Sequence, residues 1–165
     1  KKDIRTIGSG NMGATNALRT GNKIIGYTTL ILDILKAVIL LIFVKIYYIE
    51  YLYISSLCVF LGHVFPIWLK FKGGKGVATY VGILCCINLY LGIFFGIIWL
   101  MSFFVFKYSS LSSLISSFSI PIINFFIFND EIVFFFIIMF ILIFYTHREN
   151  IKRLLNRTES KTKIY

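Results

Sequence analysis

Residues 24–48 read IIGYTTLILDILKAVILLIFVKIYY, and this first long apolar block decides the class of fold. About 20 consecutive apolar residues in a helix cover the roughly 30 Å hydrocarbon core of a bilayer. The block exceeds that length, and its only charged residues are Asp33, Lys36 and Lys45. The sequence therefore predicts a transmembrane helix over these residues.

Further apolar blocks follow along the chain, at residues 52–69, 77–106, 114–128 and 132–146. The block at 77–106 is too long for one straight crossing, and residues 87–92, INLYLG, provide a hinge. A tight turn at 129–131 separates the last two blocks, and the polar tail from residue 147 is predicted to begin as a helix. We predict an all-α fold, a polytopic membrane helix bundle that forms a single domain over residues 1–165.

The composition excludes the classes that a basic charge might otherwise suggest. The mean hydropathy of +0.85 and the 58% of hydrophobic residues lie outside the usual range for a soluble domain. The net charge of +10 comes from short loops and the two ends, where it indicates cytoplasmic loops and not a nucleic-acid surface. Cys58, Cys85 and Cys86 lie in apolar runs without metal-binding spacing, so we expect buried small side chains and no metal site.

The distribution of charge decides how often residues 77–106 cross the membrane. If this block crosses twice, 15 of the 17 Lys and Arg residues share one face with both chain ends. The acidic residues Glu50, Asp130 and Glu131 then lie on the other face. The positive-inside rule thus predicts six transmembrane helices, with both chain ends in the cytoplasm.

Two glycine-rich basic segments interrupt the apolar pattern on the predicted cytoplasmic face. The first glycine segment is residues 7–22, IGSGNMGATNALRTGN, and the second glycine segment is residues 71–80, FKGGKGVATY. Glycine allows successive N–H groups to turn toward one point, and Arg19, Lys72 and Lys75 add positive charge. Together these features predict a site for a phosphate-bearing ligand at the membrane surface.

Soluble nucleotide-binding motifs do not explain these segments. Residues 8–13, GSGNMG, fit the GxGxxG pattern, but neither a preceding strand nor a βαβ unit is predicted around them. Residues 73–76, GGKG, lack the Ser or Thr that directly follows the lysine of a P-loop. The sequence also has no GxSxG elbow, and no Asp lies five residues after His63 or His147. Any catalysis is therefore expected to depend on positioning and positive charge.

Several polar residues of the apolar blocks allow two interpretations. Asp33 and Lys36 are three residues apart, so they share a helix face and are predicted to pair, in a structural or a functional role. His63 is expected to be a packed, hydrogen-bonded residue, with a catalytic role as the alternative. The serines of residues 109–113 are either helix N-caps or donors to a phosphate.

Taken in order, these segments resemble the bacterial acyl-phosphate:glycerol-3-phosphate acyltransferases. The resemblance covers nearly the whole chain, and its most specific parts are the glycine segments. It is carried by residues 3–21 (DIRTIGSGNMGATNALRTG), 33–37 (DILKA), 62–79 (GHVFPIWLKFKGGKGVAT), 110–113 (SLSS) and 147–161 (HRENIKRLLNRTESK). The resemblance implies a fold of seven membrane helices, of which the first would precede this chain and six would lie within it.

The resemblance implies that a fatty acyl phosphate gives its acyl group to the primary hydroxyl of glycerol 3-phosphate. The products would be 1-acylglycerol 3-phosphate (lysophosphatidic acid) and phosphate, in the first acylation of phospholipid synthesis. The reaction would need no coenzyme A, acyl carrier protein, metal or other cofactor, and it would take place at the bacterial inner membrane. From the residues alone, a membrane carrier for a small organic phosphate and an inactive fragment stay open as alternatives.

The resemblance also implies the residues of the site. The catalytic residues would be Lys75 and His147, and the proton of the attacking hydroxyl would pass either to His147 or to the substrate's own phosphate. Gly73 and Gly74 would contribute backbone N–H groups to a phosphate. The implied substrate-binding residues are Ser9, Gly10, Asn11, Arg19, Lys72, Gly73, Gly74, Ser110, Ser113 and Asn150.

Overall fold

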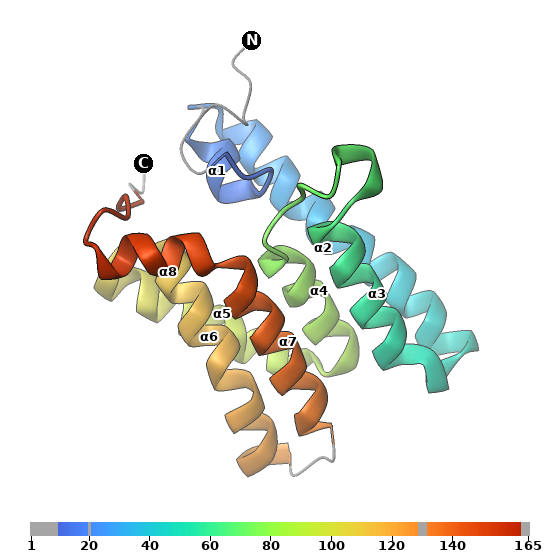
Figure 1. Cartoon of the computed structure of the whole chain (residues 1–165). Helices are drawn as coiled ribbons and strands as arrows, with labels where there is room; N and C mark the ends of the chain where they lie inside the picture. The colour runs from blue at the N-terminus through green and yellow to red at the C-terminus, as the bar shows by residue number, and fades with distance from the viewer. Residues whose placement is uncertain (1–9, 20, 129–131, 163–165) are drawn as a thin grey trace. The chain divides into compact units, whose positions relative to one another are not determined.

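The computed structural model describes residues 10–19, 21–128 and 132–162, and these residues form helices joined by loops (Figure 1). No strand occurs within these ranges. The chain divides into two compact units, the first ending at Ile87 and the second beginning at Asn88. The all-α prediction is confirmed.

The first unit is built around a long helix, α2. Its elements are α1 (Ala14–Leu18), α2 (Lys23–Tyr47), η2 (Ile49–Tyr51), α3 (Leu52–Val64), η3 (Ile67–Leu69) and α4 (Val77–Ile87). Asn22 is the N-cap residue of α2, because its side chain accepts the N–H of Ile25 at 3.3 Å. The predicted block at 52–69 is broken near Pro66, because proline lacks an N–H and disfavours helical backbone at the preceding residue.

Helices α2 and α4 pack closely through small residues. A Cβ atom added at Gly82 of α4 would lie 2.7 Å from the carbonyl oxygen of Ile34 and 3.1 Å from the Cβ of Ala37, which is fully buried. Small residues allow such close approach of helix backbones in membranes. Lys45 at the end of α2 donates to the carbonyl of Cys86 at 2.7 Å and so satisfies one of the last carbonyls of α4.

The long apolar block at 77–106 is interrupted at Asn88, as predicted. α4 ends at Ile87 and α5 (Leu89–Phe106) begins directly after it. Asn88 has extended backbone, with φ of −148°, and its side chain accepts the N–H of Tyr90 at 3.0 Å. An Asn at this position both ends one helix and caps the next. With 11 residues at about 1.5 Å each, α4 is shorter than the hydrocarbon core.

The second unit contains α5, α6 (Ser109–Ile123), η4 (Asn124–Phe128), α7 (Val133–Thr146) and α8 (Arg148–Leu155). Lys107 ends α5 in the left-handed conformation, with φ of 65°. α6 packs against both α5 and α7, and its Ile120 is fully buried like Met139 of α7. The start of the tail is helical, as predicted.

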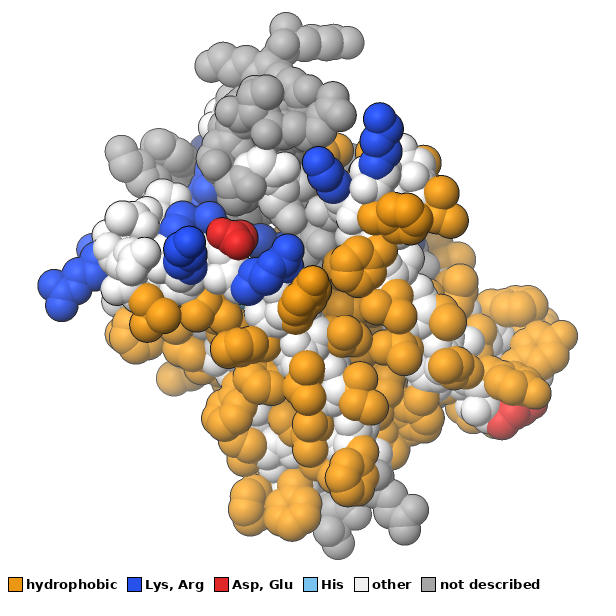
Figure 2. Space-filling view, viewed as in Figure 1, with side chains coloured by type: hydrophobic (Ala, Val, Ile, Leu, Met, Phe, Trp, Pro, Cys, Tyr) orange, Lys and Arg blue, Asp and Glu red, His pale blue; other side chains and the backbone are white. Residues whose placement is uncertain are grey.

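The outer surfaces of the helices are apolar, as expected of a membrane protein. Ile39, Phe126 and Phe134 are 67%, 76% and 73% exposed. Figure 2 shows such side chains covering the visible helix surfaces, with lysine and arginine gathered over α8 and over the loop that follows α3. In the described part of the chain, three helical segments are long and apolar enough to cross a membrane, or four if α7 and α8, bent by 63°, count as one. The count of six spans stays a prediction.

The cysteines differ from the expectation of uniform burial. All three are free; Cys86 is buried and Cys85 half-buried, but Cys58 is exposed on α3. The burial predicted for Cys58 is wrong because a membrane protein places small apolar side chains against lipid as well as in its core.

Candidate functional site

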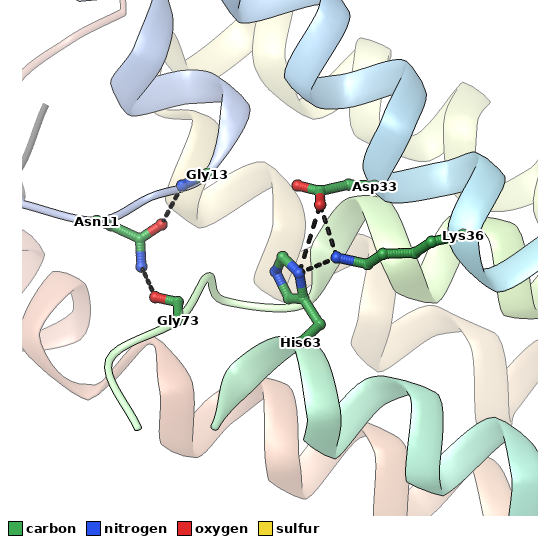
Figure 3. A network of polar contacts seen from close by, with 6 residues as sticks. All are labelled: Asn11, Gly13, Asp33, Lys36, His63 and Gly73. Carbon is green, nitrogen blue, oxygen red and sulfur yellow. Dashed lines mark hydrogen bonds and ion pairs between the residues drawn. The ribbon is translucent and has the colours of Figure 1, made fainter. Parts of the chain in front are cut away.

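Asn11 joins the two glycine segments in the first unit. Its side-chain oxygen accepts the N–H of Gly13 at 2.8 Å, and its side-chain nitrogen donates to the carbonyl of Gly73 at 3.3 Å (Figure 3). The carbonyl of Asn11 in turn accepts the side-chain N–H of Asn16 at 2.9 Å. Gly10 precedes this turn with a φ of 66°, which favours glycine. The amide of Asn11 therefore holds the segments together.

Gly73 and Gly74 lie against the end of α3. Their N–H groups donate to the carbonyls of Val64 and His63 at 3.1 and 3.3 Å. A Cβ atom at Gly73 would lie 2.1 Å from the carbonyl oxygen of His63. The expectation that these two N–H groups cradle a phosphate does not match this geometry, because both already have acceptors. Glycine is required here by close backbone packing.

The predicted cations of the first unit belong to the two joined segments. Arg19 is the C-cap residue of α1, and Lys72 and Lys75 flank the two glycines. Lys72 is exposed, whereas Arg19 and Lys75 are half-buried. Ser9 lies outside the described residues. The joined segments thus carry three fixed positive charges, which suits the binding of a phosphate.

A charge cluster of Asp33, Lys36 and His63 lies beside the second glycine segment (Figure 3). The Asp33 carboxylate accepts from Lys36 Nζ at 2.6 Å and lies 3.4 Å from His63 Nδ1, which also contacts Lys36 Nζ. The predicted Asp33–Lys36 pair and the hydrogen-bonded His63 are confirmed. The cluster lines an open pocket of about 350 Å³ with Met12, Leu40, Val59, Gly62, Pro66, Trp68, Leu69 and the two glycines.

In the second unit, the Glu159 carboxylate holds the tail in place, a role that was not predicted from the sequence. Glu159 Oε1 accepts from Ser110 Oγ at 2.8 Å and from Asn150 Nδ2 at 2.7 Å, and its Oε2 accepts from Arg153 Nε at 2.6 Å. Burial raises the pKa of the Glu159 carboxyl, but these three hydrogen bonds outweigh burial and hold the pKa below its ordinary value. The tail is thereby fastened to α6 and α8.

The serines at the start of α6 are not N-caps. Tyr108 is the N-cap residue, and its side chain makes no capping hydrogen bond within the described residues. Ser113 Oγ donates to the carbonyl of Ser109 at 2.9 Å and accepts from Trp99 Nε1 at 3.0 Å. A hydroxyl has one hydrogen to donate, and both Ser113 and Ser110 use theirs inside the protein. Donation from these serines to a phosphate, as expected from the sequence, therefore does not match this geometry.

His147 lies at the corner between α7 and α8 and is only 2% exposed. Its Nδ1 lies 2.8 Å from the carbonyl oxygen of Ile143. Because a carbonyl only accepts, Nδ1 carries the hydrogen, and Nε2 is the nitrogen that can exchange a proton. Asn150, one turn further on α8, is also buried and bound to Glu159. The imidazole is thus oriented by a backbone carbonyl.

Among residues 10–19, 21–128 and 132–162, no three His, Cys, Asp or Glu side chains come together as a metal site would require. That the reaction proceeds without a metal stays a prediction.

Comparison with known proteins places these features in a family. Residues 1–157 match the family model described as glycerol-3-phosphate acyltransferase. A glycerol-3-phosphate acyltransferase of Pelagibacter ubique (strain HTCC1062) is 65% identical over 165 residues, which cover 100% of this chain and 86% of that protein. Another, from Mesorhizobium japonicum, is 46% identical over 159 residues, which cover 96% of this chain and 82% of the relative.

A solved structure shows the same fold. The crystal structure of PlsY (YgiH), an integral membrane glycerol 3-phosphate acyltransferase, in its glycerol 3-phosphate form superposes with a TM-score of 0.91 at 38% identity. The match covers 98% of this chain and 83% of that one.

Proposed function

Because the chain belongs to the glycerol-3-phosphate acyltransferase family, we propose that it transfers a fatty acyl group from an acyl phosphate to the primary hydroxyl of glycerol 3-phosphate. The observation that carries this proposal is the match to acyltransferases over the whole chain. The related structure in its glycerol 3-phosphate form supports the acceptor. Family membership also favours a transferase over the organic-phosphate carrier and the inactive fragment.

The proposed chemistry requires no covalent intermediate on the protein. An acyl phosphate is a mixed anhydride, so the hydroxyl oxygen of glycerol 3-phosphate forms a bond to the acyl carbon while the bond from that carbon to the phosphate oxygen breaks. The hydroxyl proton passes to a phosphate oxygen of the substrate. Negative charge grows on the departing phosphate, and fixed positive charges stabilise it. Lys75, Arg19 and Lys72 supply such charges in the first unit.

We assign roles to the remaining candidate residues from the hydrogen bonds that each makes within the protein. Ser9, Gly10, Asn11 and Asn150 stay proposed substrate-binding residues. His147, the catalytic candidate from the sequence, is proposed to contact the substrate and to act mainly in binding it, while the substrate's own phosphate serves as base. Four candidates already donate their hydrogens within the protein, and we propose that they support the substrate-binding residues structurally. They are Gly73, Gly74, Ser110 and Ser113.

An acyl-transfer assay tests the proposed function. Membranes containing the protein are supplied with radiolabelled glycerol 3-phosphate and either palmitoyl phosphate or palmitoyl coenzyme A. Labelled lysophosphatidic acid is expected with palmitoyl phosphate only. Product formed only from the coenzyme A ester would contradict the proposed donor, and labelled glycerol 3-phosphate entering sealed vesicles unchanged would indicate a carrier.

The pH dependence of kcat distinguishes His147 from the substrate's own phosphate as the group that takes the hydroxyl proton. We expect His147→Ala to raise KM more than it lowers kcat, since a residue that only binds substrate acts equally on ground and transition states. The acidic limb of the profile near pH 6–7 should persist in the variant, because the second ionisation of a phosphate also falls near 6. A limb that disappears in His147→Ala would identify the histidine, with an ordinary pKa of about 6.5, as the base.

We propose that the protein lies in the bacterial inner membrane with both glycine segments in the cytoplasm. Within the first unit, the charge distribution predicts that Glu50 and Lys70 lie on opposite sides of the membrane. In a background without native cysteines, Glu50→Cys should react with an impermeant thiol reagent added outside intact cells, and Lys70→Cys only after lysis. Both positions are exposed, so equal labelling from outside would refute this topology.

A further inference from the structure

The charge cluster of Asp33, Lys36 and His63 takes no direct part in the proposed reaction, yet it lies against the second glycine segment. The two edges of the His63 ring face different neighbours. Nδ1 contacts Lys36 Nζ and lies 3.4 Å from the Asp33 carboxylate (Figure 3). The Nε2 edge faces Gly74, where an added Cβ atom would lie 2.0 Å from Nε2 and 2.5 Å from Cε1. The ring is therefore held between the charges of α2 and the backbone of Gly74.

The contacts at Nδ1 fix the orientation of the ring. An ammonium group has only donors, so it donates both to the Asp33 carboxylate at 2.6 Å and to the lone pair of Nδ1. Rotating the ring would remove one of the two acceptors of Lys36 Nζ, whose side chain is 40% exposed, and would leave Asp33 as the other. The charged pair thus selects one position of the imidazole.

The position of the ring is transmitted to the residues that follow. The carbonyl oxygens of His63 and Val64 accept the N–H groups of Gly74 and Gly73, and the carbonyl of Gly73 accepts from Asn11. Lys75 is the next residue. If the His63 ring moves, the backbone of Gly74 that packs against it moves as well, and Lys75 is displaced with it. A displacement of about 1 Å in a binding group can cost ~10²-fold in rate.

We infer that Asp33 and Lys36 are positioning residues, which hold the His63 ring as the support of Gly73 and Gly74 and so determine where Lys75 stands. This inference rests on the proposed function, because its main readout is acyl transfer. By this inference, Asp33 and Lys36 affect phosphate binding through His63 and Lys75, without contacting the phosphate.

The isosteric variant Asp33→Asn tests the role of the charge. In protein that elutes as a single species in detergent, kcat/KM for acyl phosphate, the substrate whose phosphate Lys75 is proposed to bind, is expected to fall about 10-fold, carried mainly by KM. A displaced loop weakens phosphate binding in the ground state and the transition state alike. A charge pair that served only to stabilise α2 would lower the Tm and leave KM unchanged, and that result would overturn the inference.

A pair of glycine variants tests the support by the ring. Gly74→Ala clashes with the ring of His63, whereas Gly73→Ala clashes with backbone carbonyls and Pro66, which truncation of His63 leaves in place. Gly74→Ala should lower kcat/KM at least about 10-fold in the unmodified protein but less than about 2-fold in a His63→Ala background. Gly73→Ala, the matched control, should be equally damaging in both backgrounds. The same pattern is expected in the Tm values.

Two results distinguish failure of this inference from failure of the proposed function. If Gly74→Ala is as damaging with His63→Ala as without it, in activity and in Tm, the ring does not support the segment. If the unmodified protein transfers no acyl group, the proposed function fails, and the Tm values of the same variants still decide whether His63 and Gly74 are coupled. Coupling of the Tm values alone, with unchanged KM in Asp33→Asn, refutes the positioning role.

Discussion

Lys75→Ala is expected to lower kcat/KM for acyl transfer at least about 100-fold while leaving the protein folded. The lysine directly follows the two packed glycines, so its backbone is fixed while its ammonium group supplies charge to a phosphate. A charge-assisted hydrogen bond is worth ~1.5–3 kcal/mol, and removing one stabilising donor from a preorganised site costs ~10²–10³-fold. The variant is assayed with both substrates varied, beside its elution profile in detergent.

Two further variants make this result specific. Lys75→Arg keeps the charge but replaces a compact ammonium group with a planar fork, so it should recover only part of the activity. Lys23→Ala removes an exposed lysine at the start of α2 and should leave kcat/KM within about 2-fold. Near-normal turnover by Lys75→Ala would overturn the assignment of the second glycine segment to phosphate binding.

The second large effect is expected at Glu159. Glu159→Ala leaves Ser110, Asn150 and Arg153 without their shared acceptor, and each lost contact to a charged group costs ~1–3 kcal/mol. The expected results are a fall in Tm of roughly 5–10 °C and a loss of most of the activity, because the tail no longer holds Asn150. Glu149→Ala, at an exposed acid of α8, is the control. Equal Tm values for both variants would show that the tail does not depend on this carboxylate.

The stability contributed by Glu159 should depend on pH with a defined sign. The folded pKa of this carboxyl is lowered from its ordinary value of about 4.5, so its contribution is fully present above that value and is lost as pH falls through the folded pKa. The difference in Tm between the unmodified protein and Glu159→Gln should therefore be constant near neutral pH and should shrink under acid. A difference that grows on acidification would contradict the sign of the pKa shift.

The sequence predicted those features that depend on neighbouring residues. The apolar blocks at 24–48 and 132–146 place α2 and α7 within one or two residues of their observed bounds. The interruption at Asn88 and the Asp33–Lys36 pair were also predictable, since a polar cap and a three-residue spacing are local signals.

The sequence could not predict features that depend on contacts between distant residues. Glu159 binds Ser110, 49 residues away, and periodicity carries no information on such a contact. The serines of α6 were misassigned because a hydroxyl in apolar surroundings bonds the carbonyl one turn back in its own helix. In the sequence, Gly73 and Gly74 are consistent both with an anion site and with a close backbone contact. Only their packing against α3 in the structure distinguishes these two explanations.

The proposed function requires that an acyl group pass from acyl phosphate to glycerol 3-phosphate on this protein. The most direct test supplies purified protein with acyl phosphate and glycerol 3-phosphate and measures both products over time. The proposal predicts one phosphate released for each lysophosphatidic acid formed, with both products lost together in Lys75→Ala. Phosphate released without lysophosphatidic acid, or lysophosphatidic acid formed only when coenzyme A ester is supplied, would contradict it.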